Sequence, residues 1–82
     1  MNASQHSAVS MPLPLASPGE PVRITAFAQG RDVEKRLAGM GLTLGCEVHL
    51  LQHEGGNLVV AVGNTRLALG HGLAQKILVT PA

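Results

Sequence analysis

Aromatic residues are almost missing from this chain of 82 residues, which has one Phe and neither Trp nor Tyr. Grooves that bind proline-rich peptides are built from stacked aromatic side chains, so recognition of that kind is excluded. Proteins that bind single-stranded nucleic acid stack its bases on aromatic side chains, and the same shortage argues against that activity. The net charge is only +1, from six basic and five acidic residues, which is far from a nucleic-acid-binding footprint. We therefore expect no nucleic-acid partner.

Cysteine is nearly absent as well. The single one, Cys46, can form no internal disulfide and no Cys-rich zinc site. Its apolar sequence context, without an adjacent activating cation, favours a buried structural thiol. No apolar run approaches the roughly 18–20 residues that cross a bilayer, so the chain is not expected to span a membrane. Because the chain also lacks the charged start and apolar run of a secretory signal, we expect a cytoplasmic location.

Recognisable catalytic patterns are missing too. The glycine-containing segments at Gly30 and Gly70 do not match a phosphate-binding loop, which needs a Lys followed by Ser or Thr. No Ser or Cys has a recognisable base nearby in the sequence. We therefore expect the protein not to be an enzyme.

Length predicts one domain. Residues 1–11 are mostly small or polar and show no period, so we expect a disordered tail. Residues 12–82 would then form the domain, near the size at which stability is marginal. The hydrophobic share of 45% comes mainly from Leu, Val and Ala.

The most informative segment is 32–51, which predicts a short helix, a glycine-rich turn and a strand. Asp32 is expected to be the N-cap of the helix. The apolar residues of the helix recur on one face, at Val33, Leu37 and Met40. Gly41 suits the left-handed position after a helix, with Leu42 packing back on the last turn.

Short apolar runs separated by glycine-rich turns predict five strands, at 20–27, 45–54, 58–62, 65–69 and 76–80. One helix lies between the first two strands, and a single helical turn precedes the last. A bend or bulge is expected at Phe27, where the alternation breaks. So short a sheet must curl to bury its single apolar face, which predicts a mainly β fold, a small five-stranded barrel.

The order and spacing of several motifs resemble the FeoA family over residues 13–80. The motifs are Pro18-Gly19-Glu20, Val22-Arg23-Ile24, Lys35-Arg36-Leu37, Gly39-Met40-Gly41-Leu42, Gly45-Cys46-Glu47-Val48, Leu67-Ala68-Leu69-Gly70 with Ala74, and Ile77-Leu78-Val79. The resemblance implies an SH3-like barrel with a helical insertion after the first strand. It also implies a small cytoplasmic partner of the FeoB ferrous iron transporter, a membrane protein with a GTPase domain. The same barrel occurs as a C-terminal module of iron-dependent repressors.

Three positions depart from the family pattern. Leu44 stands where the family usually has Pro, just before Gly45. Gln29 and Gly30 stand where two glycines are common, and His71 stands where Arg often follows. The first two departures concern the stiffness of turns, and the third would alter a surface contact.

Candidate partner-binding residues are of two kinds. Lys35 and Arg36 lie on the exposed face of the predicted helix and could meet an acidic surface, although a plain solvated face is the alternative. Leu51, Val59 and Leu78 are apolar residues on outward sheet faces and would mark an interface if exposed together. The alternative is that the helix or the N-terminal segment covers them. Aliphatic edge strands also allow a homodimer.

The best candidate metal ligands are Glu47 and His49, which would lie about 6–7 Å apart on one strand face. His49 and His53 would lie about 13 Å apart, too far to share an ion. His6 falls in the predicted tail, and the sequence does not place His71. Two ligands predict weak, adventitious binding of a divalent transition metal, and no cofactor is expected to be required.

The sequence thus predicts a small non-enzymatic interaction module that binds and modulates a FeoB-type ferrous iron transporter. Two alternatives stay open. One is a regulatory barrel that acts with an iron-dependent repressor, although the chain has no DNA-recognition helix of its own. The other is a weak transition-metal-binding protein.

Overall fold

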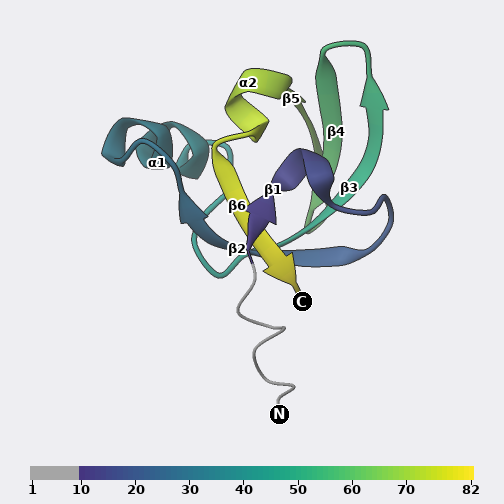
Figure 1. Ribbon diagram of the computed structural model, residues 1–82, viewed down its shortest axis with the longest axis horizontal. Helices are drawn as coiled ribbons and strands as arrows, with labels where there is room; N and C mark the ends of the chain where they lie inside the picture. Colours follow the sequence, from purple (N-terminus) through teal and green to yellow (C-terminus); the bar gives the residue numbers. More distant parts are fainter. Residues whose placement is uncertain (1–9) are drawn as a thin grey trace.

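The curled sheet of the computed structural model, which describes residues 10–82, is antiparallel and has six strands in the order β1-β6-β2-β3-β4-β5 (Figure 1). The elements in chain order are β1 (Met11–Pro12), η2 (Leu13–Leu15, a 3₁₀ turn), β2 (Pro21–Phe27), α1 (Arg31–Ala38), β3 (Glu47–Glu54), β4 (Asn57–Val62), β5 (Thr65–Gly70), α2 (His71–Ala74) and β6 (Ile77–Pro81). Most of the predicted tail, residues 1–9, lies outside the described residues.

Alternation along the strands builds the core. Val22 and Ile24 of β2 and Ile77 and Val79 of β6 are all at most 3% exposed, as the period of two predicted. Burying one such aliphatic side chain contributes roughly 1.5–3 kcal/mol relative to leaving it in water. The mainly β barrel fold is thereby confirmed, and aliphatic side chains build its interior.

Two bulges help the short sheet to curl. The register of β2 against β6 skips Thr25, and the register of β3 against β4 skips Leu51. The sequence predicted one bulge at Phe27, two residues from the observed position, and it did not predict the second. A bulge increases the local twist of its strand, so both irregularities favour closure of the sheet around its apolar face.

The predicted number of strands was one too low. The sixth strand is β1, whose Met11 and Pro12 pair with Val79 and Leu78 of β6. The residues after it complete the core, because Leu13 is fully buried. Prolines obscured this strand in the sequence, but Pro is tolerated on an edge strand, where its missing N–H is not needed. Met11, assigned to the tail, is the first residue of β1.

The start of α1 differs from the prediction. Gly30, with φ 85° and ψ −155°, is the N-cap, and no side chain makes a capping hydrogen bond. Gln29 also has a positive φ, of 68°, so two consecutive left-handed residues turn the chain before the helix begins at Arg31. Asp32 therefore lies inside the first turn, where its carboxylate still interacts favourably with the helix dipole.

The end of α1 is as predicted. Gly41 has φ 90° and donates its N–H to the Ala38 carbonyl at 3.0 Å. Leu42 donates to the Leu37 carbonyl at 2.9 Å, which completes a Schellman motif. Leu37 and Leu42 are both fully buried. The ending thus satisfies two helix carbonyls and adds two leucines to the core.

A tight turn delays the start of β3. The Cys46 N–H donates to the Thr43 carbonyl at 3.1 Å, and Gly45 donates to the Ile24 carbonyl at 2.8 Å. Gly45, at the third position of this turn, has φ 84°, as a type II turn requires. The predicted strand start at Gly45 is therefore wrong, because that residue belongs to the turn and β3 begins at Glu47.

Candidate functional site

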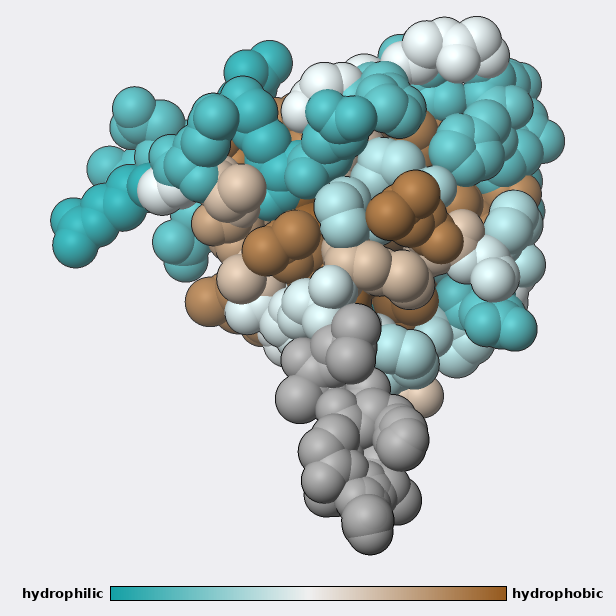
Figure 2. Space-filling view, in the orientation of Figure 1, coloured by the Kyte–Doolittle hydropathy of each residue, from teal (hydrophilic) through white to brown (hydrophobic). Residues whose placement is uncertain are grey.

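The charged candidates lie on α1, at one side of the barrel (Figure 1). Lys35 and Arg36 are both exposed, and neither forms an ion pair with any residue of 10–82. The same holds for Arg31, so half of the six basic residues of the chain stand on this helix without a partner among the described residues. Figure 2 shows hydrophilic side chains projecting at the left of the molecule, where α1 lies.

The apolar candidates of the sheet are not brought together. Leu51, Val59 and Leu78 are each half-buried. Leu51 and Val59 lie on the neighbouring strands β3 and β4, whereas Leu78 lies on β6, which β2 separates from β3. A continuous exposed apolar patch made of these three residues is therefore absent from the described surface.

The exposed apolar residues of the structure are different ones. The large apolar side chains in 10–82 that face solvent are Leu15 (69%), Leu44 (52%) and Met40 (38%). Sequence reasoning placed Met40 on the apolar face of the helix, but the chain leaves the helix before that residue. One sequence signal pointed to an exposed leucine. Leu44 stands at a turn position where the related family usually has Pro.

The candidate metal ligands do come together. His49 Nε2 lies 3.9 Å from Glu47 Oε2, and Arg23 Nη2 lies 3.8 Å from the other carboxylate oxygen. The cross-strand pairing of Arg23 with Glu47 places this cation there. Within residues 10–82, no three His, Cys, Asp or Glu side chains gather closely enough to hold an ion. The pair can offer two donors, and Arg23 competes for one of them.

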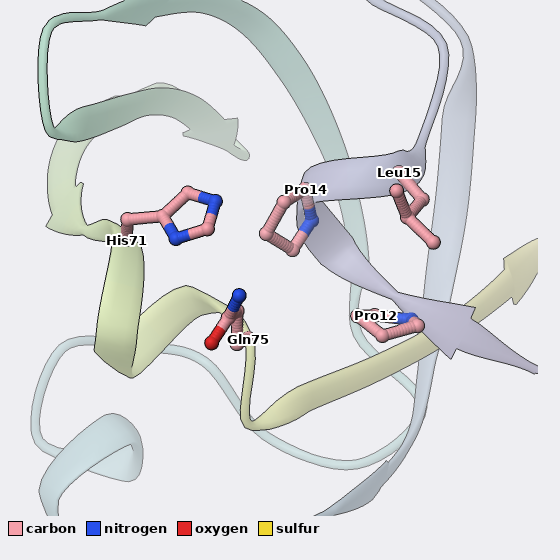
Figure 3. Close-up of a pocket in the computed structure, with 5 residues that line it drawn as sticks. All are labelled: Pro12, Pro14, Leu15, His71 and Gln75. Carbon is pink, nitrogen blue, oxygen red and sulfur yellow. The ribbon is translucent and has the colours of Figure 1, made fainter.

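His71, which the sequence could not place, is the first residue of α2 and lines an open groove of about 410 Å³ (Figure 3). The groove lies between α2 and the N-terminal segment, and its lining residues are Pro12, Pro14, Leu15, His71 and Gln75. Figure 3 shows the imidazole turned toward Pro14. Within residues 10–82, His71 does not join the pair on β3 in a group of three possible ligands.

Cys46 is half-buried, rather than buried as expected. Its Sγ lies 3.8 Å from the Gly41 carbonyl oxygen and 3.7 Å from that of Glu47. These contacts place the thiol between the helix ending and β3, where it packs against the core.

Comparison with known families identifies the domain. A family model described as the FeoA domain matches residues 11–81. This chain belongs to the FeoA family. A protein of Methanocaldococcus jannaschii, named "Putative Fe(2+) transport protein A", is 31% identical over 71 residues, which cover 87% of each chain. The members of the FeoA family are small proteins involved in ferrous iron transport.

Solved structures share the fold. A crystal structure of an iron uptake regulatory protein (FeoA) has a TM-score of 0.81 and 30% identity, over 90% of this chain and 99% of that one. The solution structure of iron(II) transport protein A from Clostridium thermocellum has a TM-score of 0.79 and 30% identity, over 88% of this chain and 46% of that one. These matches confirm the FeoA-type, SH3-like β fold that the sequence predicted.

A manganese-dependent transcriptional repressor contains a similar barrel, with a TM-score of 0.78 and 20% identity over 89% of this chain and 42% of that one. At this identity the likeness concerns the fold alone. No helix within residues 10–82 has the length and hydropathy needed to cross a membrane.

Proposed function

We propose that this protein binds the cytoplasmic part of a FeoB-type ferrous iron transporter and modulates its assembly or activity. The observation that carries the proposal is the family match, which extends over residues 11–81 and so takes in nearly every described residue. The transporter, a membrane protein with a GTPase domain, is the partner that family membership suggests, and the cytoplasm is the compartment in which the two would meet.

The chemistry of the described surface favours binding over catalysis. The cations of α1 are exposed and form no ion pair within residues 10–82, so they are available to a charged partner. A protein of this kind can act on a transporter only through a difference in affinity between two of its states. The proposed mechanism is therefore preferential binding to one conformation of the transporter.

Two surfaces are proposed for this contact. The first contains Lys35 and Arg36 on α1, which are exposed and unpaired among the described residues. The second is on the sheet, with Leu51 and Val59 on neighbouring strands and Leu78 apart from them on β6. All three are half-buried, which leaves less area for a partner. Because the cations are exposed and the three apolar residues are half-buried, α1 is the better supported surface.

Co-purification with the cytoplasmic part of the transporter encoded by the same organism tests the proposal. Wild-type protein should be recovered with the transporter, and Lys35→Glu should reduce recovery because it reverses a charge on α1. Leu51→Asp tests the sheet surface, and Arg66→Glu on β5 is the matched charge control. Absence of recovery for the wild type would contradict the proposed function. If Lys35→Glu and Leu51→Asp were both recovered as well as the wild type, the two surfaces would be excluded and the proposed partnership would remain.

A further inference from the structure

The segment 35–46, which runs from the last turn of α1 to the start of β3, differs in charge from its surroundings. It contains Lys35 and Arg36 and no acidic residue. Of the flanking acids, Glu47 contacts Arg23 and His49, and Glu34 precedes Lys35 in α1. The segment itself therefore carries two positive charges, and neither forms an ion pair within residues 10–82.

The same segment holds two of the three large apolar side chains that face solvent within 10–82, namely Met40 and Leu44. Arg36 lies in the last turn of α1, and Met40 follows the C-cap residue Gly39. The loop after Met40 closes on itself, since Cys46 Sγ lies 3.8 Å from the Gly41 carbonyl oxygen, so Met40 and Leu44 belong to one short loop. A further cation, Arg23, lies at the turn that contains Leu44, because Arg23 Nη1 donates to the Gly45 carbonyl at 2.9 Å. Figure 2 shows hydrophilic side chains over α1 and hydrophobic ones below it on the same face.

The backbone holds these side chains in fixed positions. The Schellman motif ties Leu42 to Leu37, and Gly45 is hydrogen-bonded through its N–H to β2. A backbone that is already ordered loses little further entropy when a partner covers its exposed side chains. Neither the turn nor the core requires a large apolar side chain at Leu44. The side chain is therefore free to contact a partner.

We propose that Lys35, Arg36, Met40 and Leu44 form one docking surface, here named the α1 surface. The occupant it fits is an acidic segment of the transporter's cytoplasmic part that places apolar residues on Met40 and Leu44 and carboxylates beside Lys35 and Arg36. This inference depends on the proposed function and deepens it by naming the surface and the chemistry of its partner. The cations speed and orient the encounter, and the apolar contacts supply most of the affinity.

The test is a titration of the purified full-length protein with the transporter's cytoplasmic part, with matched pairs of variants. Leu44→Ser is compared with Leu15→Ser, which alters another exposed leucine, in η2. Arg36→Glu is compared with Arg66→Glu, which reverses an exposed charge on β5. We expect the two α1-surface variants to bind about tenfold more weakly or worse, as truncation of a central interface residue does. Both controls should bind within about twofold of the wild type, as peripheral residues do.

Salt dependence separates the two contributions. Raising the salt concentration should weaken binding of the wild type and of Leu44→Ser, and it should have less effect on Arg36→Glu, because screening acts on the charge that this variant has lost. Equal affinity of the α1-surface variants and their controls, with the wild type still binding, would overturn the α1 surface and leave the proposed function intact. No binding by the wild type would overturn both. If Leu44→Ser unfolds, as circular dichroism would show, Arg36→Glu decides alone.

Discussion

Leu44 occupies the second position of a tight turn with about half of its side chain in solvent. Its backbone N–H makes no hydrogen bond with the described residues, and the following Gly45 supplies the left-handed conformation that the turn needs. Pro at this position would fix φ near the value that the second residue of a type II turn adopts. The leucine side chain is therefore not needed for the turn, and it can contribute to a binding surface.

The variant Leu44→Pro should be more stable than the wild type by about 0.4–1 kcal/mol, because it reduces the entropy of the unfolded chain at a compatible position. Urea unfolding followed by circular dichroism measures the change, with Leu44→Ala as the control for loss of the side chain. A lower midpoint for the proline variant than for the alanine variant would contradict this assignment of the turn.

The pair Glu47 and His49 makes a second prediction at this scale. Because two protein donors leave the remaining positions of an ion to water, titration calorimetry with zinc or ferrous ion should detect weak binding, lost in His49→Ala. His53→Ala is the matched control on the same strand and should bind as the wild type does. Tight, stoichiometric binding would show that further ligands join the pair.

At the scale of elements, the ending of α1 is the feature that most depends on one residue type. Gly41 has φ 90°, and a Cβ at this position would meet no atom within 4 Å. The cost of a side chain there is therefore backbone strain alone, and it is not caused by a clash. The same motif orders the segment that leads to Leu44, so the helix ending both closes the core and fixes the α1 surface.

The variant Gly41→Ala should lose about 1–2 kcal/mol of stability, because an L-residue is strained in the left-handed region. Gly72→Ala is the control, since Gly72 lies in α2 with nothing within 4 Å of a Cβ and without a positive φ. That variant should be neutral or slightly stabilised, because Ala is the better helix former. Equal losses in thermal or urea unfolding would refute the strain argument.

At the scale of the whole molecule, closure of the barrel requires the N-terminal segment. Leu13 has no exposed area and joins a core shared with β6 and α2, and Ala16 is almost as buried. The strands alone would leave this side of the core open. The N-terminal segment, which lies outside the five predicted strands, is thus part of the hydrophobic interior.

Leu13→Ala should lower the free energy of unfolding by about 2–5 kcal/mol, the range for leucines truncated inside a core. Leu15→Ala, two residues away and exposed, should change it by less than about 0.5 kcal/mol, as surface substitutions do. Denaturant unfolding of both variants measures the difference. Similar small effects would show that the N-terminal segment does not close the barrel.

Local patterns account for the parts that were predicted. The ending of α1 follows from Gly41 and from the hydrogen bond that joins Leu42 to Leu37, five residues earlier. The inward residues of β2 and β6 follow from the alternation of apolar residues along each strand. The proximity of Glu47 and His49 follows from the same period. The bulge at Leu51 and strand β1 were missed because they depend on pairing with distant segments, whose geometry a local pattern does not contain. The N-cap was missed because the helix begins after Gln29 and Gly30, which both have positive φ, without a side-chain cap.

The sequence by itself determined the order of the two helices and of five of the six strands, the apolar faces of β2 and β6 and membership of the FeoA family. These features depend on residue type and spacing along the chain. Only the tertiary structure decided which side chains stay in solvent. Leu51, Val59 and Leu78 are half-buried while Met40 and Leu44 are exposed, because burial depends on which distant segments fold over a residue. The surface available to a partner is therefore a property of the folded barrel.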